Sequence, residues 1–81
     1  MAKKQRITQP SEFCLELGKH LRALRKSKDL SIEEIAYKAN IDAQNLRKYE
    51  LGKQEMKIGM LKRIADAFEI TPSELIDFKI N

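Results

Sequence analysis

The segment IDAQNLRKYELGK, residues 41–53, contains the side chains of the chain that could do the most specific chemistry. Leu46 and Tyr49 fall on one face of a helix and can be buried there. The outward face then consists of Ala43, Gln44, Asn45, Arg47 and Lys48. Gln and Asn amides can pair with adenine in the major groove of DNA, and Arg can pair with guanine. The segment is therefore consistent with a base-reading helix, and equally with an ordinary surface helix, because these residues are common on any surface.

A tight turn, Asn40-Ile41-Asp42, joins this helix to a short helix that precedes it. The earlier helix is predicted to begin after Ser31, because Ser31 and Glu34 form an S-x-x-E capping box ahead of an apolar face. Asn tolerates the positive φ that such a turn needs, an apolar residue can pin the turn to the core, and Asp is a favourable N-cap. Two short helices joined in this way have the plan of a helix-turn-helix.

Three more helices are predicted around this pair, which gives an all-α protein. The first begins at Ser11 and ends near Lys28 or Asp29, and the fourth runs to Phe68, with Gly59 in its first turn. The segment Thr71-Pro72-Ser73-Glu74 is a second capping box and starts a short fifth helix. The predicted core comprises Leu17, Leu21, Leu24, Leu30, Ile35, Ala36, Ala39, Ile41, Leu46, Tyr49, Ile58, Leu61, Ile64, Phe68, Ile70 and Leu75.

The domain organisation follows from the same patterns. Residues 1–10 are polar and unpatterned and predict a flexible basic N-terminal arm, residues 11–76 a single domain, and residues 77–81 a C-terminal tail. The apolar and polar residues of the tail alternate, so it is either a frayed end, which we favour, or a short strand.

The charges of the chain are unevenly distributed. The net charge is +4, with eight Lys or Arg against two Asp or Glu in residues 1–28 and six against two in residues 43–63. A clustered basic surface is typical of a protein that binds a polyanion, although a solvated surface would have a similar composition. The N-terminus lacks the apolar core of a signal peptide and no apolar run is long enough to span a membrane, so we expect a cytoplasmic protein without a membrane partner.

Other residues that could carry chemistry are isolated in the sequence. Cys14 is the only cysteine and follows the spacing of core positions, and His20 is the only histidine and is predicted to lie at the surface. Glu33 and Glu34 are adjacent, so on a helix they diverge by about 100° and form no catalytic pair. Tyr37 points outward and could touch a phosphate or simply cover surface. We therefore expect no metal site, no cofactor and no enzymatic activity.

Several motifs of residues 18–76 follow one another in a characteristic order and spacing. They are LRALRKSKDLSIEEIA, the turn after Ala39, YELGK, LKRIADAF and ITPSELI. In this order they resemble the phage-repressor/Cro-type (XRE-like) helix-turn-helix DNA-binding family, over about three quarters of the chain. The resemblance implies a five-helix lambda-repressor-like DNA-binding domain with a central helix-turn-helix. It also implies double-stranded operator DNA as the partner and, commonly, a two-fold homodimer.

The resemblance also implies roles for individual residues. DNA contacts are expected from Asp42, Ala43, Gln44, Asn45, Arg47 and Lys48, with help from the capping hydroxyl of Ser31. Lys53 and Lys57 lie in the loop where the family touches the DNA backbone, although a solvated lysine explains each equally well. Arg25 and Glu50 stand where the family often has a buried ion pair, so we expect a structural role for both.

The chain departs from the family pattern at several positions. Ile32 stands where the family commonly has a phosphate-binding Gln, and Ala43 offers a thymine methyl group at most a small apolar contact. These two departures affect DNA affinity and sequence preference. Met56 and Lys57 replace a common Pro-Ser/Thr helix start, and Glu69 replaces a common Gly between the last two helices.

Two functions of different classes are compatible with the sequence. The first is a sequence-specific transcriptional regulator, a repressor that binds a near-palindromic operator as a dimer. The second is a protein-interaction module, such as an antitoxin that binds a partner protein, with DNA binding secondary. The apolar residues Ile32, Ala43, Ile76, Phe78 and Ile80 favour the second. A steep dependence of DNA affinity on salt would favour the first.

Overall fold

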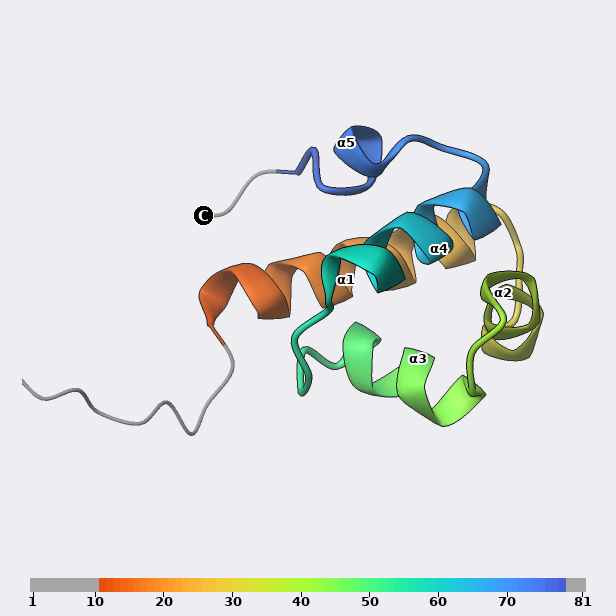
Figure 1. The fold of residues 1–81 in the computed structure, drawn as a ribbon, viewed down its shortest axis with the longest axis horizontal. Coiled ribbons are helices and arrows are strands. Elements are labelled where there is room, and N and C mark those ends of the chain that lie inside the picture. Colours follow the sequence, from red (N-terminus) through yellow and green to blue (C-terminus); the bar gives the residue numbers. More distant parts are fainter. Residues whose placement is uncertain (1–10, 79–81) are drawn as a thin grey trace, which may run out of the picture.

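The protein is all-helical over residues 11–78, the part of the chain that the computed structural model describes. Its helices are α1 (Glu12–Ser27), α2 (Ile32–Ala39), α3 (Ala43–Glu50), α4 (Ile58–Phe68) and α5 (Pro72–Leu75). Figure 1 shows α3 and α5 on opposite sides of the layer that contains α1 and α4, with α2 at one end. The all-α, five-helix prediction is confirmed. The predicted N-terminal arm lies outside the described residues, as does the tail beyond Phe78.

Three helices, α1, α2 and α5, begin at residues whose side chains cap them. Ser31 caps α2 and Thr71 caps α5, each in a complete capping box with the Glu three residues later. At the start of α1, Ser11 Oγ accepts a hydrogen bond from the backbone N–H of Cys14, at 3.1 Å. Asp42 precedes α3 as predicted, but its side chain makes no capping hydrogen bond, so that part of the prediction is wrong.

Two helices end in the left-handed backbone conformation. Asn40 ends α2 with φ 59°, which confirms the prediction from its side-chain type. Glu69 ends α4 with φ 62°, in the place where the family that the sequence resembles commonly has Gly. A left-handed conformation costs an L-residue about 1–2 kcal/mol relative to Gly, so the departure at Glu69 keeps the turn and adds strain.

Every helix contributes one of the five largest fully buried side chains of the core. These are Leu21, Ile35, Leu46, Ile64 and Leu75. Burial of a side chain of this size contributes about 1.5–3 kcal/mol, so the five together unite the helices into one cooperative unit. Around them lie the half-buried predicted core residues, which are Leu24, Leu30, Ile41, Leu61 and Ile70.

The burial predictions for Ile58 and His20 are wrong. Ile58 is 84% exposed, because it is the first residue of α4 and only the later turns of that helix are covered. His20 is half-buried rather than at the surface, because Phe78 folds back onto α1 with its ring centroid 5.2 Å from that of His20. The Nε2 atom of His20 is buried and has no hydrogen-bond partner among residues 11–78. Phe78 also packs on Phe13, at 5.3 Å between ring centroids.

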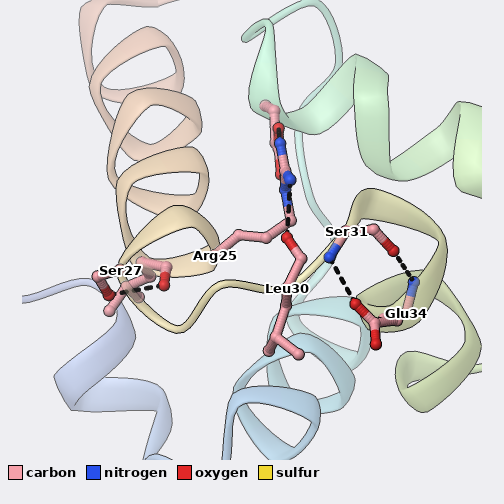
Figure 2. Close-up of polar contacts among 7 residues, drawn as sticks. Arg25, Ser27, Leu30, Ser31 and Glu34 are labelled. Carbon is pink, nitrogen blue, oxygen red and sulfur yellow. Dashed lines mark hydrogen bonds and ion pairs between the residues drawn. The ribbon is translucent and has the colours of Figure 1, made fainter.

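A buried ion pair joins α1 to α3 and to the loop before α2. Arg25 Nε donates to Glu50 Oε2 at 2.7 Å and Nη2 donates to Glu50 Oε1 at 3.0 Å. Arg25 Nη1 donates to the carbonyl oxygen of Leu30 at 3.0 Å, and Figure 2 shows Arg25 reaching from α1 toward this carbonyl. The side chains of Arg25 and Glu50 are only 13% and 5% exposed. The predicted structural pair is therefore confirmed, and its hydrogen bonds raise the pKa of Arg25 against the effect of burial.

The close approach of α1 and α3 depends on Gly18. A Cβ atom at this position would lie 2.5 Å from the carbonyl oxygen of Tyr49 and would also collide with that of Glu50. Backbone atoms at the end of a packed helix cannot move aside as a flexible side chain can. Gly18 therefore sets the distance between α1 and the helix that carries the outward polar face.

The variant Gly18→Ala should lower the free energy of unfolding by about 2–3 kcal/mol, since overpacking forces the backbones apart. The matched control is Gly59→Ala, where a Cβ atom meets nothing within 4 Å. That control should raise the free energy of unfolding by up to about 1 kcal/mol, because Ala is the better helix former. Urea denaturation of both variants measures the difference, and wild-type stability of Gly18→Ala would contradict the close packing.

The variant Glu50→Ala, which removes one partner of the ion pair, should lower the free energy of unfolding by about 3–5 kcal/mol. The reason is that the guanidinium of Arg25 is left buried without its counter-charge. The double variant Arg25→Met/Glu50→Leu should recover most of that loss, because both charges are then absent. Thermal and urea unfolding followed by circular dichroism measure both effects. A Glu50→Ala protein as stable as wild type would show that the pair contributes little.

Candidate nucleic-acid interface

The turn between α2 and α3 is held by a backbone hydrogen bond to α2 and by a side chain of α4. The N–H of Ile41 donates to the carbonyl of Ala36 at 2.9 Å, which closes the end of α2. Arg63 of α4 donates through Nε to the carbonyl of Ala39 at 3.1 Å and through Nη2 to that of Asn40. A charged donor on α2's last carbonyls suits the negative end of the helix dipole. This clamp fixes the direction in which α3 leaves the turn.

The polar face of α3 is exposed much as the sequence predicts. Gln44, Arg47 and Lys48 are exposed, whereas Leu46 and Tyr49 are buried. Two residues expected to lie outside are half-buried, namely Ala43, which packs against the core, and Asn45. Asp42 is exposed and its carboxylate, free of a capping bond, remains available to another donor. The helix therefore offers solvent an amide and two cations on one side.

The start of α2 is preorganised by its capping box. Ser31 Oγ accepts from the N–H of Glu34 at 3.0 Å, while the N–H of Ser31 donates to Glu34 Oε1 at 2.7 Å. Both contacts are drawn in Figure 2. The hydrogen bond from the Ser31 backbone lowers the pKa of Glu34. The hydroxyl and the backbone N–H of Ser31 are therefore both engaged with Glu34.

A solvent-open groove of about 310 Å³ lies where α1, α2 and α3 meet. The residues that line it include Arg22, Arg25, Ser31, Ile32, Arg47 and Glu50. Ile32 is itself buried and belongs to the hydrophobic core, so its side chain serves packing. The sequence prediction did not include Arg22, because α1 lies outside the helix-turn-helix and no local pattern places it beside α3.

Lys53 and Lys57 flank the loop between α3 and α4, and both are exposed. The N–H of Lys53 donates to the carbonyl of Lys48 at 2.9 Å, which keeps the start of this loop against the end of α3. Lys57 is the N-cap of α4, without a capping side-chain bond. Neither amine has an ion-pair partner among residues 11–78, so both can meet an external anion.

Arg63, which clamps the turn, is a second residue that the sequence prediction missed. Its two acceptors are the carbonyl oxygens of Ala39 and Asn40, which precede Arg63 in the chain by 24 and 23 residues. A lone Arg on an amphipathic helix carries no local signal for such a contact. Only the packing of α4 against α2 brings the three residues together.

The remaining candidate residues show no catalytic arrangement. Cys14 is buried as predicted, and its Sγ donates to the carbonyl of Gln54 at 3.5 Å. Burial, followed by the charge of Glu55, raises the pKa of its thiol, which disfavours the reactive thiolate. Tyr37 is 85% exposed on α2, as predicted. Within residues 11–78, no three His, Cys, Asp or Glu residues are placed to hold a metal ion, and no helix is long and apolar enough to cross a membrane.

Solved structures with the same fold come from bacterial regulators. The restriction-modification controller protein C.AhdI from Aeromonas hydrophila is 31% identical, with 76% of this chain and 94% of that chain aligned and a TM-score of 0.75. C.Esp1396I, solved as a tetramer in complex with its natural 35 base-pair operator, is 21% identical over 83% of this chain and 88% of its own, with a TM-score of 0.77.

A third structure has the same fold. The clp gene regulator ClgR from C. glutamicum is 22% identical over 84% of this chain and 87% of its own, with a TM-score of 0.73. No curated protein matches the chain. The family model HTH_3, helix-turn-helix, matches residues 21–75, which span α2, the turn, α3 and most of the other helices. The chain therefore belongs to the XRE-type helix-turn-helix family of DNA-binding transcriptional regulators.

Proposed function

We propose that the domain binds a near-palindromic operator as a homodimer and represses transcription by occupying that site. The observation that carries the proposal is the exposed face of α3, which presents Gln44, Arg47 and Lys48 to solvent while the clamped turn fixes its direction. A helix-turn-helix places its second helix in the major groove, where such side chains meet base edges and phosphates. Repression is the outcome expected when a small domain occupies a site within a promoter.

Base reading falls to the N-terminal half of α3 in this proposal. Gln44 is exposed and can form two hydrogen bonds with adenine, and the free carboxylate of Asp42 can accept from the amino group of cytosine. Asn45, although half-buried, lies next to Gln44, and Ala43 adds an apolar contact at most. Lys48, Lys53 and Lys57 supply phosphate contacts, which bring affinity without sequence preference.

A homodimer is supported by the need for two half-sites and by an apolar surface. Ile76 is 39% exposed and lines an apolar groove of about 310 Å³ together with Phe13, Met56 and Leu61. C.Esp1396I was solved as a tetramer on its operator, which is compatible with assembly through such a surface. Two copies related by a two-fold axis would present their α3 helices about 34 Å apart, or one turn of DNA.

The same apolar groove also supports the alternative function. An antitoxin-like module would use it to bind a partner protein, with DNA binding secondary. The two functions differ in salt dependence, because release of counterions from DNA makes its binding fall steeply with salt, whereas apolar protein binding changes little.

The variant Gln44→Ala should weaken binding to the operator by about 5- to 150-fold, the loss of one bidentate base contact at about 1–3 kcal/mol. The measurement is selection of bound duplexes from a random pool, followed by affinity measurements on the enriched site. The wild type should enrich a near-palindrome, and Gln44→Ala should lose preference at one base pair of each half-site.

The matched control for this prediction is Gln54→Ala, which removes an exposed amide from the loop after α3 and should leave the selected sequence unchanged. Circular dichroism confirms that both variants fold. If the wild type enriches no duplex and binds all of them weakly and alike, the regulator proposal fails and the partner-protein function gains support.

The variant Ile76→Asp should convert a wild-type dimer to monomer, because a carboxylate would be desolvated in an apolar interface. Ile76 is a cleaner probe than Phe78, since Phe78 packs on its own α1. Sedimentation equilibrium without DNA measures the change, with Tyr37→Asp on α2 as the control that should remain dimeric. An Ile76→Asp protein that stays dimeric would place the dimer surface elsewhere.

A further inference from the structure

The groove between α1, α2 and α3 contains more positive charge than its carboxylate neutralises. Arg25 and Glu50 satisfy one another at its wall through two hydrogen bonds. Arg22 and Arg47 line the same groove, are exposed, and form no ion pair with any residue from 11 to 78. Two guanidinium groups from different helices therefore share one solvent-open space without a carboxylate of their own.

The start of α2 adds further hydrogen-bond donors to this groove. Ser31, the N-cap of α2, lines it, although its hydroxyl and its backbone N–H are both engaged with Glu34. The first N–H groups of any helix lack an acceptor within the helix and lie at its positive end. Glu33, whose charge acts on Arg25 from the first turn of α2, opposes an anion here, but its single charge is outnumbered by Arg22 and Arg47.

We infer that this groove binds one phosphate of the DNA backbone, held between Arg22 and Arg47. The inference rests on the proposed DNA-binding function and deepens it by changing the role of Arg47 from base reading to backbone contact. A guanidinium fork matches the oxygens of a phosphate and can bind it through two hydrogen bonds. Two forks that face the same space can hold a phosphate from opposite sides.

The position of Arg47 on α3 agrees with this role. Arg47 is three residues after Gln44, so it lies almost one helical turn, about 5 Å, farther along the helix axis. It shares the groove wall with Glu50, on the side of α3 that faces α1, while Gln44 takes no part in the groove. When Gln44 contacts a base, Arg47 is therefore directed to the flanking backbone.

Arg22 also explains how the protein binds DNA without the Gln that its relatives commonly have at the start of α2. Ile32 occupies that place and is buried in the core, so it can donate nothing to a phosphate. Arg22 reaches the same groove from α1, which Gly18 holds close to α3. The side-chain donor to the phosphate thus lies on α1, outside the helix-turn-helix, rather than on α2.

The test compares Arg22→Ala and Arg47→Ala with Lys26→Ala, which removes an exposed cation of α1 that does not line the groove. Affinity is measured on the selected operator and on a random duplex across a salt series. Each Arg variant should weaken binding to both duplexes alike, keep the selected sequence, and reduce the slope of log affinity against log salt by about 0.9 for each half-site. Lys26→Ala should leave the slope unchanged.

A chemical change in the DNA identifies the phosphate. Neutral methylphosphonate groups replace the operator phosphates one at a time. At one position in each half-site the replacement should weaken wild-type binding and have no further effect on the Arg22→Ala/Arg47→Ala double variant. If the losses in binding free energy were additive at every position, the inference would be overturned. No single phosphate would then be bound through the two arginines.

The remaining outcomes separate this inference from its alternatives. An altered base preference in Arg47→Ala would overturn it and return Arg47 to base reading. Failure of the wild type to bind any duplex specifically would instead defeat the proposed function.

Discussion

The structure depends above all on the buried ion pair between Arg25 and Glu50. It joins three parts of the chain that are distant in sequence, because the same guanidinium also holds the carbonyl of Leu30 ahead of α2. Two charges removed from water are tolerated only when each satisfies the other's hydrogen bonds, so the geometry that pairs them is strongly selected over nearby arrangements. The orientation of α3 relative to α1 and α2 follows from that requirement.

The buried pair also separates structural from functional charge on the same surface. Arg25 is paired with Glu50. Arg22 lies one helical turn before Arg25, and Arg47 lies one turn before Glu50. Both line the groove without a carboxylate partner among residues 11–78. Burial therefore separates the basic residues of this surface into two groups. Cations that meet a carboxylate inside hold the helices together, and cations that do not remain available to a polyanion.

Local signals in the sequence were sufficient for the helices and for much of the candidate site. The capping box at Ser31 and the left-handed turn at Asn40 were both predicted, because each depends on backbone groups within four residues. The buried face of α3 followed from helical periodicity, which is also local. The Arg25–Glu50 pair spans 25 residues and was accessible only through the family resemblance.

The sequence by itself determined which segments form helices, that capping boxes begin α2 and α5, and that Leu46 and Tyr49 lie on the buried face of α3. Tertiary structure alone decided that Ile58 is exposed, that His20 lies beneath Phe78, and that Arg22 shares a groove with Arg47. The physical reason is range: a helix is stabilised by contacts three or four residues apart, whereas exposure and charge pairing depend on which other helix covers a position.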